Sequence, residues 1–204
     1  MAAVAAIVPL SLLEAIRSLD APVEDGLDEL SPEIVSKRLG LSSTVAAQIA
    51  RYRDLAEREG TLPRDEAVSV FRLVGRRQDA ALVFADAGRR AARHAARRVA
   101  TDALTRVSPN ALGRRLAARA ARRAARDVFG AELGFTGGLA SASIADSPAV
   151  EAWPGGEACA YHAAALSELL RILTGFEGIM RQVRCRGRGD AACEWQAVPG
   201  GDYE

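Results

Sequence analysis

The sequence predicts an α+β fold in which an antiparallel sheet is flanked by helices. Residues 79–127 are rich in alanine and arginine with apolar positions at helical spacing, which indicates long helices. After Gly130 the pattern changes to short apolar runs separated by glycines, which is typical of strands and turns. Two such runs, 179–186 and 193–198, are joined by a short turn, so they form a hairpin rather than a βαβ unit.

Composition limits the class of protein. The chain has 204 residues, of which 49% are hydrophobic, and its formal net charge is +1. This length allows one domain with a modest extension and a substantial core. No run reaches the roughly twenty apolar residues that a membrane-spanning helix needs, so we expect no membrane partner. The three cysteines are an odd number, which argues against a disulfide framework and suits a reducing, cytoplasmic location.

The first sixty residues are predicted to be mainly helical. The apolar start, residues 1–13, has no basic segment before it and is followed by Glu14, so it is expected to pack on the body rather than act as a signal peptide. An amphipathic helix is predicted over residues 9–20. Ser31 and Pro32 have the residue types that begin a second helix.

A third helix is predicted from Ser42 or Ser43 to about residue 60, and residues 32–56 superficially resemble a helix-turn-helix. In a DNA-binding protein, Gln48, Arg51 and Arg53 would be the side chains that reach bases. The same pattern fits an ordinary helical hairpin, which we favour. Nucleic acid is therefore not the partner that we expect.

The middle of the chain carries one predicted strand and two long helices. The strand is expected at residues 68–74, and the helices at about 79–104 and 110–127. The helices contain many arginines and few acids. Such a face can meet an anionic ligand, or it can simply be solvated, and we favour the second interpretation.

The C-terminal part alternates strands, turns and one helix. Gly134, Gly137 and Gly138 are expected to mark turns. The predicted elements that follow are a strand at 139–145, a helix at 157–173 with a leucine stripe, and the hairpin strands 179–186 and 193–198.

The three cysteines form a candidate metal site. Cys185 and Cys193 lie on the two arms of the predicted hairpin, and Cys159 lies in the first turn of the preceding helix. Thiolates are soft ligands that suit a tetrahedral zinc ion. The alternative is that these side chains are small buried hydrophobic groups, which is common for free cysteine.

A fourth ligand is open among Gln182, His162 and Glu157. Gln182 lies three residues before Cys185, so a regular strand would place the two on opposite faces unless a bulge intervenes. His162 follows Cys159 by three residues and shares its helical face. Imidazole is a better zinc ligand than an amide oxygen, which slightly favours His162.

Residues 145–198 resemble the C-terminal half of the 4-vinyl reductase (hydrocarbon-binding) domain family. The matching features are an Asp-Ser-Pro turn at 146–148, a helix opened by Cys159, a strand ending in Cys185, a Gly-Asp turn at 189–190, and Cys193 before Trp195. The resemblance extends weakly back to about residue 65. Within this family, the chain most resembles the bacteriochlorophyll 4-vinyl reductase group, and the segment 159–164 carries that resemblance.

The resemblance implies a fold shared with nitric-oxide-signalling domains and with a vesicle-tethering subunit of Golgi transport. It implies a homodimer, a hydrophobic small-molecule ligand between helices and sheet, and zinc held by three Cys and one Glu. Here Gln182 stands at the Glu position. We assign residues 1–62 to an N-terminal helical extension and residues 63–204 to the ligand-binding domain. The aromatic residues expected to line the ligand pocket are Phe84, Phe129, Phe135, Trp153 and Tyr161.

The expected function is therefore a binding or carrier domain for a hydrophobic ligand or a tetrapyrrole intermediate, with a structural zinc site. One alternative is a ligand-responsive transcriptional regulator, and another is an accessory protein or reductase of bacteriochlorophyll biosynthesis. The sequence has no glycine-rich dinucleotide loop and too few cysteines for an iron–sulfur cluster. We therefore assign no catalytic residues and do not expect an enzyme.

Overall fold

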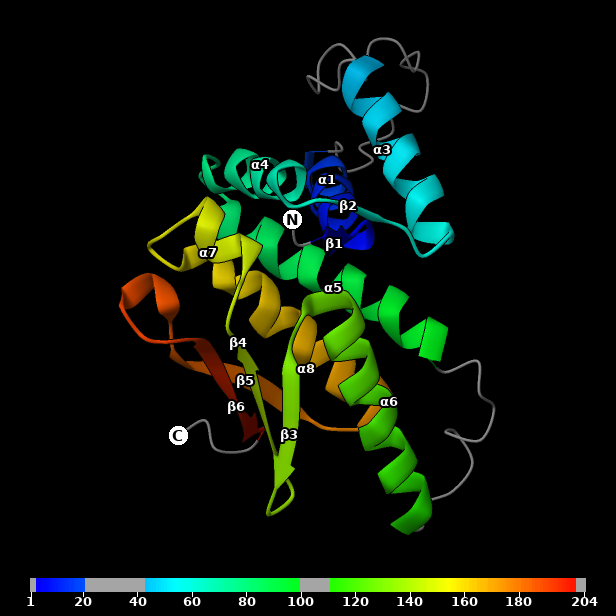
Figure 1. The fold of residues 1–204 in the computed structure, drawn as a ribbon, viewed down its shortest axis with the longest axis vertical. Coiled ribbons are helices and arrows are strands. Elements are labelled where there is room, and N and C mark those ends of the chain that lie inside the picture. Colours follow the sequence, from blue (N-terminus) through cyan, green and yellow to red (C-terminus); the bar gives the residue numbers. More distant parts are fainter. Residues whose placement is uncertain (1–2, 21–42, 100–110, 201–204) are drawn as a thin grey trace, which may run out of the picture.

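The computed structural model describes residues 3–20, 43–99 and 111–200 (Figure 1). The helix predicted to start at Ser31 lies outside these residues. The N-terminal elements are β1 (Ala3–Ala5), α1 (Ile7–Asp20), α3 (Ser43–Glu57), β2 (Thr61–Pro63) and α4 (Arg64–Gly75). The C-terminal elements are α5 (Ala80–Val99), α6 (Ala111–Phe129), β3 (Glu132–Thr136), β4 (Leu139–Ile144), α7 (Pro148–Ala152), η1 (Glu157–Cys159), α8 (Ala160–Thr174), β5 (Gly178–Arg184), η2 (Arg186–Arg188) and β6 (Cys193–Pro199).

The architecture is α+β, as predicted. The main sheet has four antiparallel strands in the order β3-β4-β6-β5, and β1 pairs with β2 in a separate two-stranded sheet. Helices α8 and α6 pack next to the main sheet, and α5 packs on α8. In Figure 1, α5 crosses the molecule between the N-terminal helices and α8.

Small residues let α5 and α8 approach closely. Ala87, Ala91 and Ala95 on α5 are almost fully buried. A Cβ on Gly88 would clash with the backbone carbonyl of Tyr161, so the helices touch through their main chains at this point. The abundant alanine of this segment therefore sets the distance between the two central helices.

The apolar start of the chain packs on the body, as expected. Leu12 is fully buried, α1 contacts α5, and the hydroxyls of Ser11 and Tyr161 lie 3.4 Å apart. The boundary assigned between residues 62 and 63 falls inside β2, whose register pairs Leu62 with Val4. The described part of the N-terminal extension thus shares one hydrophobic core with the rest of the chain.

The strand predicted at residues 68–74 is wrong, because this segment lies within helix α4. Ala67, Phe71 and Val74 recur at helical spacing and are completely buried against neighbouring elements. Asp65 and Glu66 in the first turn also favour a helix, since acidic side chains interact well with a helix N-terminus. Burial of a helical face outweighed the strand preference of the valines.

The prediction that the glycines after residue 130 mark turns is only partly correct. Gly134 lies inside β3 rather than in a turn. Gly137 and Gly138 do form the turn between β3 and β4, and both have positive φ, 61° and 86°. The other helices and strands predicted in the described part of the chain are present, with ends shifted by a few residues.

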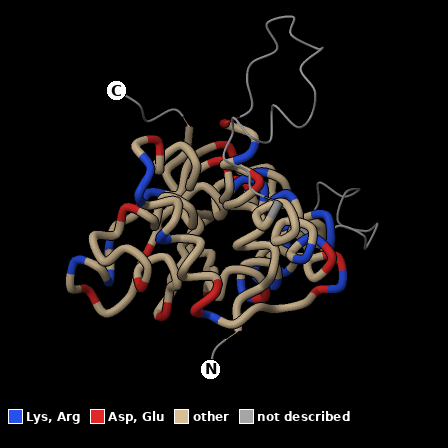
Figure 2. The backbone as a smooth tube through the Cα atoms, turned by 90° about the horizontal axis from the view of Figure 1, so that it is seen from above, with Lys and Arg blue, Asp and Glu red and all other residues tan. Residues whose placement is uncertain are grey.

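The three side chains that would reach bases in a DNA-binding protein interact with other residues of this chain. Gln48 bonds to Tyr52 at 2.7 Å, Arg51 pairs with Glu66 at 2.9 Å, and Arg53 pairs with Glu14 at 2.7 Å. Basic and acidic residues occur near one another around much of the molecule (Figure 2). Within the described ranges, no helix combines the length and apolar character needed to cross a bilayer.

Candidate metal centre

The three cysteines come together in one buried cluster, as the sequence predicted. Cys159 ends η1 directly before α8, Cys185 follows β5, and Cys193 begins β6. Their sulfur atoms all lie within 4.8 Å of one another, and those of Cys159 and Cys193 are 3.8 Å apart. Each residue is at most 1% exposed, and none forms a disulfide. Three converging thiols can hold a metal ion.

A bulge and a tight turn bring Cys185 to Cys193. The β5–β6 register shifts between Gln182 and Arg184, so the end of β5 departs from regular alternation. In the turn that follows, the backbone N–H of Cys185 donates to Asp190 Oδ2 at 2.7 Å. The backbone N–H of Arg186 donates to Cys193 Sγ at 3.4 Å. These bonds fix both sulfurs on the same side of the hairpin.

The loop before η1 covers the cluster through backbone atoms. Gly156 has a φ of 87°. It lies so close to Cys185 that a Cβ added to Gly156 would be 2.6 Å from the Cys185 sulfur. A Cβ on Gly187 would likewise clash with the carbonyl oxygen of Pro154. Loop and hairpin turn therefore pack main chain against main chain, which glycine alone permits here.

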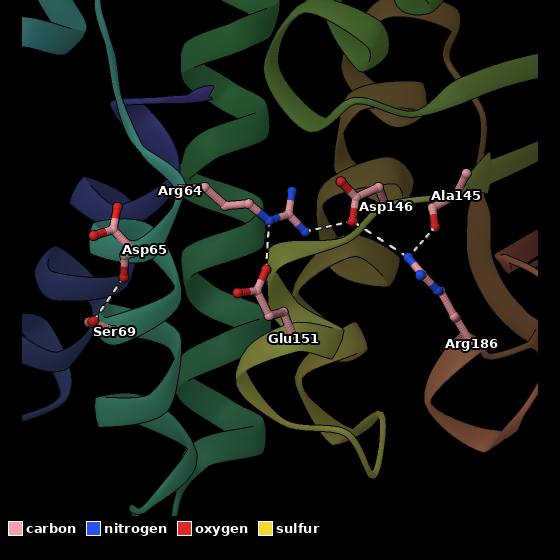
Figure 3. Close-up of polar contacts among 7 residues, drawn as sticks. All are labelled: Arg64, Asp65, Ser69, Ala145, Asp146, Glu151 and Arg186. Carbon is pink, nitrogen blue, oxygen red and sulfur yellow. Dashed lines mark hydrogen bonds and ion pairs between the residues drawn. The ribbon is translucent and has the colours of Figure 1, made fainter. Parts of the chain in front are cut away.

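Arginines tie this region to the rest of the molecule (Figure 3). Arg64, at the start of α4, pairs with Asp146 at 2.7 Å and with Glu151 of α7 at 2.6 Å. Arg186 of η2 donates to the carbonyl of Ala145 at 2.8 Å and reaches Asp146 at 3.5 Å. Asp146 thus joins α4 and the cysteine hairpin at the end of β4.

Burial determines the electrostatics of the thiols. It raises the pKa of Cys159 and of Cys193, because a buried thiolate loses its hydration. The hydrogen bond from the Arg186 N–H works in the opposite direction at Cys193. A bound cation would offset this cost, since metal coordination deprotonates a thiol outright. The donor set, three soft sulfurs in a dry site, fits zinc.

The candidates for a fourth ligand differ in their surroundings. The bulge that would let Gln182 and Cys185 face the same side is present between Gln182 and Arg184. The Gln182 side chain also lowers the pKa of Cys159. Gln182 Nε2 is buried and makes no hydrogen bond of regular geometry to any described residue. Among the described residues, the cluster within 4.8 Å contains the three thiols without a His162 nitrogen or a Glu157 oxygen.

His162 lies in an aromatic environment. Its ring stacks on Trp195 with centroids 5.8 Å apart, and burial lowers its pKa to about 4, which keeps it neutral. Its Nδ1 is buried without a hydrogen-bond partner in the part of the chain that the structure describes. No sequence pattern indicated the contact between His162 and Trp195, because the two residues are 33 positions apart.

The predicted ligand-lining aromatics do not gather in one pocket. Three of them, Tyr161, Phe84 and Phe129, are core residues. The rings of Tyr161 and Phe129 meet edge-on, with their centroids 6.3 Å apart. Phe135 lies under Arg122, whose guanidinium is 5.1 Å from the ring centroid. Trp153 packs against the backbone of α4, where a Cβ on Gly75 would lie 2.8 Å from its ring.

A cavity of about 750 Å³ lies elsewhere, and none of the five aromatic residues lines it. Its walls come from β1, the turn between α3 and β2, the C-terminal part of α5, and α6. No sequence motif indicated this cavity. It arises because elements from both halves of the chain meet there.

In a comparison with known protein families, the part of the chain that carries the cysteines matches one family model. Residues 141–199 match the family model described as the V4R domain. The match contains Cys159, Cys185, Cys193 and Gln182, and it supports the predicted 4-vinyl-reductase-like domain without singling out the bacteriochlorophyll group. No curated protein and no solved structure matches the chain.

Proposed function

We propose that this protein is a binding or carrier module for a hydrophobic small molecule, because residues 141–199 match the V4R family model. In this proposal one zinc ion, held by Cys159, Cys185, Cys193 and Gln182, braces the domain. The observation that carries it is the convergence of three buried thiols from separate elements onto one point.

A structural role fits the position of the thiols. They link η1, the end of β5 and the start of β6, so a shared ion would cross-link the helix to the hairpin. Four protein ligands would close the coordination shell, which is typical of structural rather than catalytic zinc. When bound, zinc would supply folding free energy and keep the thiols ionised.

Gln182 is the fourth ligand that we favour over His162. Its side chain lowers the pKa of Cys159, and its buried Nε2 has no hydrogen-bond partner among the described residues. The two amide positions are nearly isosteric, so a rotation of the amide would place Oε1 where Nε2 lies. Three thiolates and a neutral amide would leave the zinc complex with a net charge of −1.

The proposed ligand is hydrophobic, and a tetrapyrrole intermediate is one candidate. The cavity of about 750 Å³ is of the size that small-molecule sites have, about 300–1,000 Å³. A porphyrin titrated with the purified protein would shift its absorbance spectrum if it binds. An unchanged spectrum would eliminate tetrapyrroles and leave other hydrophobic ligands. We also propose the homodimer that the family resemblance implies, which analytical ultracentrifugation tests.

Metal analysis of the purified full chain tests the zinc centre. We expect one zinc per chain, and cobalt substitution should give the sulfur-to-cobalt charge-transfer bands of a thiolate site. Cys185→Ser should lose both signals. Arg188→Ala, an exposed change in the same turn, is the matched control and should keep them. Wild-type protein that takes up neither zinc nor cobalt would contradict the proposal.

A further inference from the structure

The cavity of about 750 Å³ lies where the N-terminal segment meets the two arginine-rich helices. One wall comes from Ala5, Ala6 and Ile7 and from the turn at Gly60 and Thr61. The facing wall comes from α5 and α6. The position is remote from the cysteine cluster, whose residues do not line it.

Many of the residues that line the cavity have small apolar side chains. On α5 and α6 these include Ala95, Val99, Ala120, Ala124 and Val128. Alanine at positions where helices usually place larger residues leaves the space open. An apolar ligand body would exchange water for hydrocarbon contact here, which is the main favourable contribution in small-molecule sites.

The charged residues at the cavity are not balanced. Arg98 pairs with Glu59, and Arg123 pairs with Asp127 at 3.4 Å. Arg119 also lines the cavity, on the exposed side of α6, and has no hydrogen-bond or ion-pair partner within residues 3–20, 43–99 and 111–200. The three arginines and two acids leave one uncompensated positive charge beside an apolar surface.

We propose that this cavity binds an amphipathic carboxylate, with the apolar body against the alanines and the carboxylate on Arg119. The inference rests on the proposed ligand-binding function and names the chemical class of the ligand. It also gives the N-terminal segment a role, because β1 and the turn before β2 form part of the site. Arginine suits this task, since its guanidinium donates two parallel hydrogen bonds to a carboxylate.

Isothermal titration calorimetry with two probes tests the proposal on the full chain. Laurate carries the carboxylate, and lauryl alcohol is its neutral counterpart. Laurate should bind the wild type, and Arg119→Gln should weaken it about tenfold, the change expected for loss of one charge-assisted contact. The alcohol should bind less tightly than laurate, and Arg119→Gln should leave its affinity unchanged.

Two variants locate the site. Ala120→Leu fills the cavity and should weaken both probes, whereas Arg115→Gln, an exposed arginine of the same helix outside the lining, should weaken neither. Equal binding of laurate to wild type and Arg119→Gln would overturn the assignment of the carboxylate. If Ala120→Leu binds both probes as tightly as the wild type does, the ligand does not occupy this cavity. Failure of the wild type to bind laurate at all would also overturn the proposal. Zinc content measured on the same samples shows whether the metal proposal fails separately.

Discussion

Gly156 and Cys185 touch directly, since a Cβ on Gly156 would lie 2.6 Å from the Cys185 sulfur. The loop that carries Gly156 leads into η1, which ends at Cys159. One backbone contact therefore positions two of the three thiols relative to each other. This makes the cluster sensitive to a residue that has no side chain of its own.

Gly156→Ala should disturb the metal centre. The added methyl group must displace the Cys185 sulfur, and alanine is strained at a φ of 87°. We expect a loss of about 1–3 kcal/mol in unfolding free energy, together with weaker zinc retention against a chelator. Gly137→Ala is the matched control, because its φ is 61° and nothing lies within 4 Å. Equal effects of both changes would show that only backbone strain matters.

Gln182→Glu should tighten zinc binding. A carboxylate is a stronger zinc ligand than an amide, and it adds a negative charge to the coordination shell. Competition with a chromogenic chelator measures the affinity, and Gln182→Leu, which cannot coordinate, should weaken it. Unchanged zinc affinity in both variants would eliminate Gln182 as a ligand and favour His162.

Asp190→Ala should loosen the hairpin turn. Its carboxylate accepts the backbone N–H of Cys185 at 2.7 Å, and that donor would lose its partner. We expect about 1–3 kcal/mol of destabilisation in urea unfolding and faster zinc release. Asp190→Asn keeps an acceptor oxygen and should retain most of the stability. A deficit in Asp190→Asn as large as in Asp190→Ala would contradict this explanation.

Glu168 should contribute a pH-dependent part of the stability. It is 7% exposed, and its hydrogen bonds with Arg171 and Arg93 lower its pKa to about 2. Because the folded pKa lies below the unfolded one, this stability is present above the unfolded pKa of about 4.3 and is lost as the pH falls toward about 2.

Glu168→Gln tests this contribution. Above pH 5 the variant should be less stable than the wild type by about 1–3 kcal/mol, and the difference should shrink between pH 4 and pH 2. Acid release of any bound metal would affect both proteins alike, so the difference isolates Glu168. A gap that stays constant down to pH 2 would refute the assignment.

Gly88→Ala should destabilise the fold although alanine is the better helix former. The new methyl group would clash with the carbonyl of Tyr161, and we expect a cost of about 1–3 kcal/mol from overpacking. Ala81→Gly, at an exposed position of the same helix, measures the propensity difference, with a loss of about 1 kcal/mol. Thermal unfolding compares the two. A stabilised Gly88→Ala would mean that α5 and α8 lie farther apart.

The sequence by itself determined the fold class, most of the helices and the identity of the thiol cluster. These features depend on local patterns. Helical spacing fixes the buried face of α5, and a short glycine turn brings Cys185, directly after β5, close to Cys193, the first residue of β6. The need for a bulge beside Gln182 could also be derived, because strand alternation is a fixed geometric rule.

Only the tertiary structure decided the features that depend on long-range packing. Residues 68–74 became helical because the burial of one face outweighed the strand preference of valine. Phe84 and Tyr161 became core residues because α5 and α8 approach through Gly88. The cavity joins Ala5, Ala6 and Ile7 to residues of α5 and α6 about 90 to 120 positions later in the chain, so no local pattern could indicate it. Local periodicity determines which face of an element is buried, whereas the neighbour that covers it is decided by the packing of the whole chain.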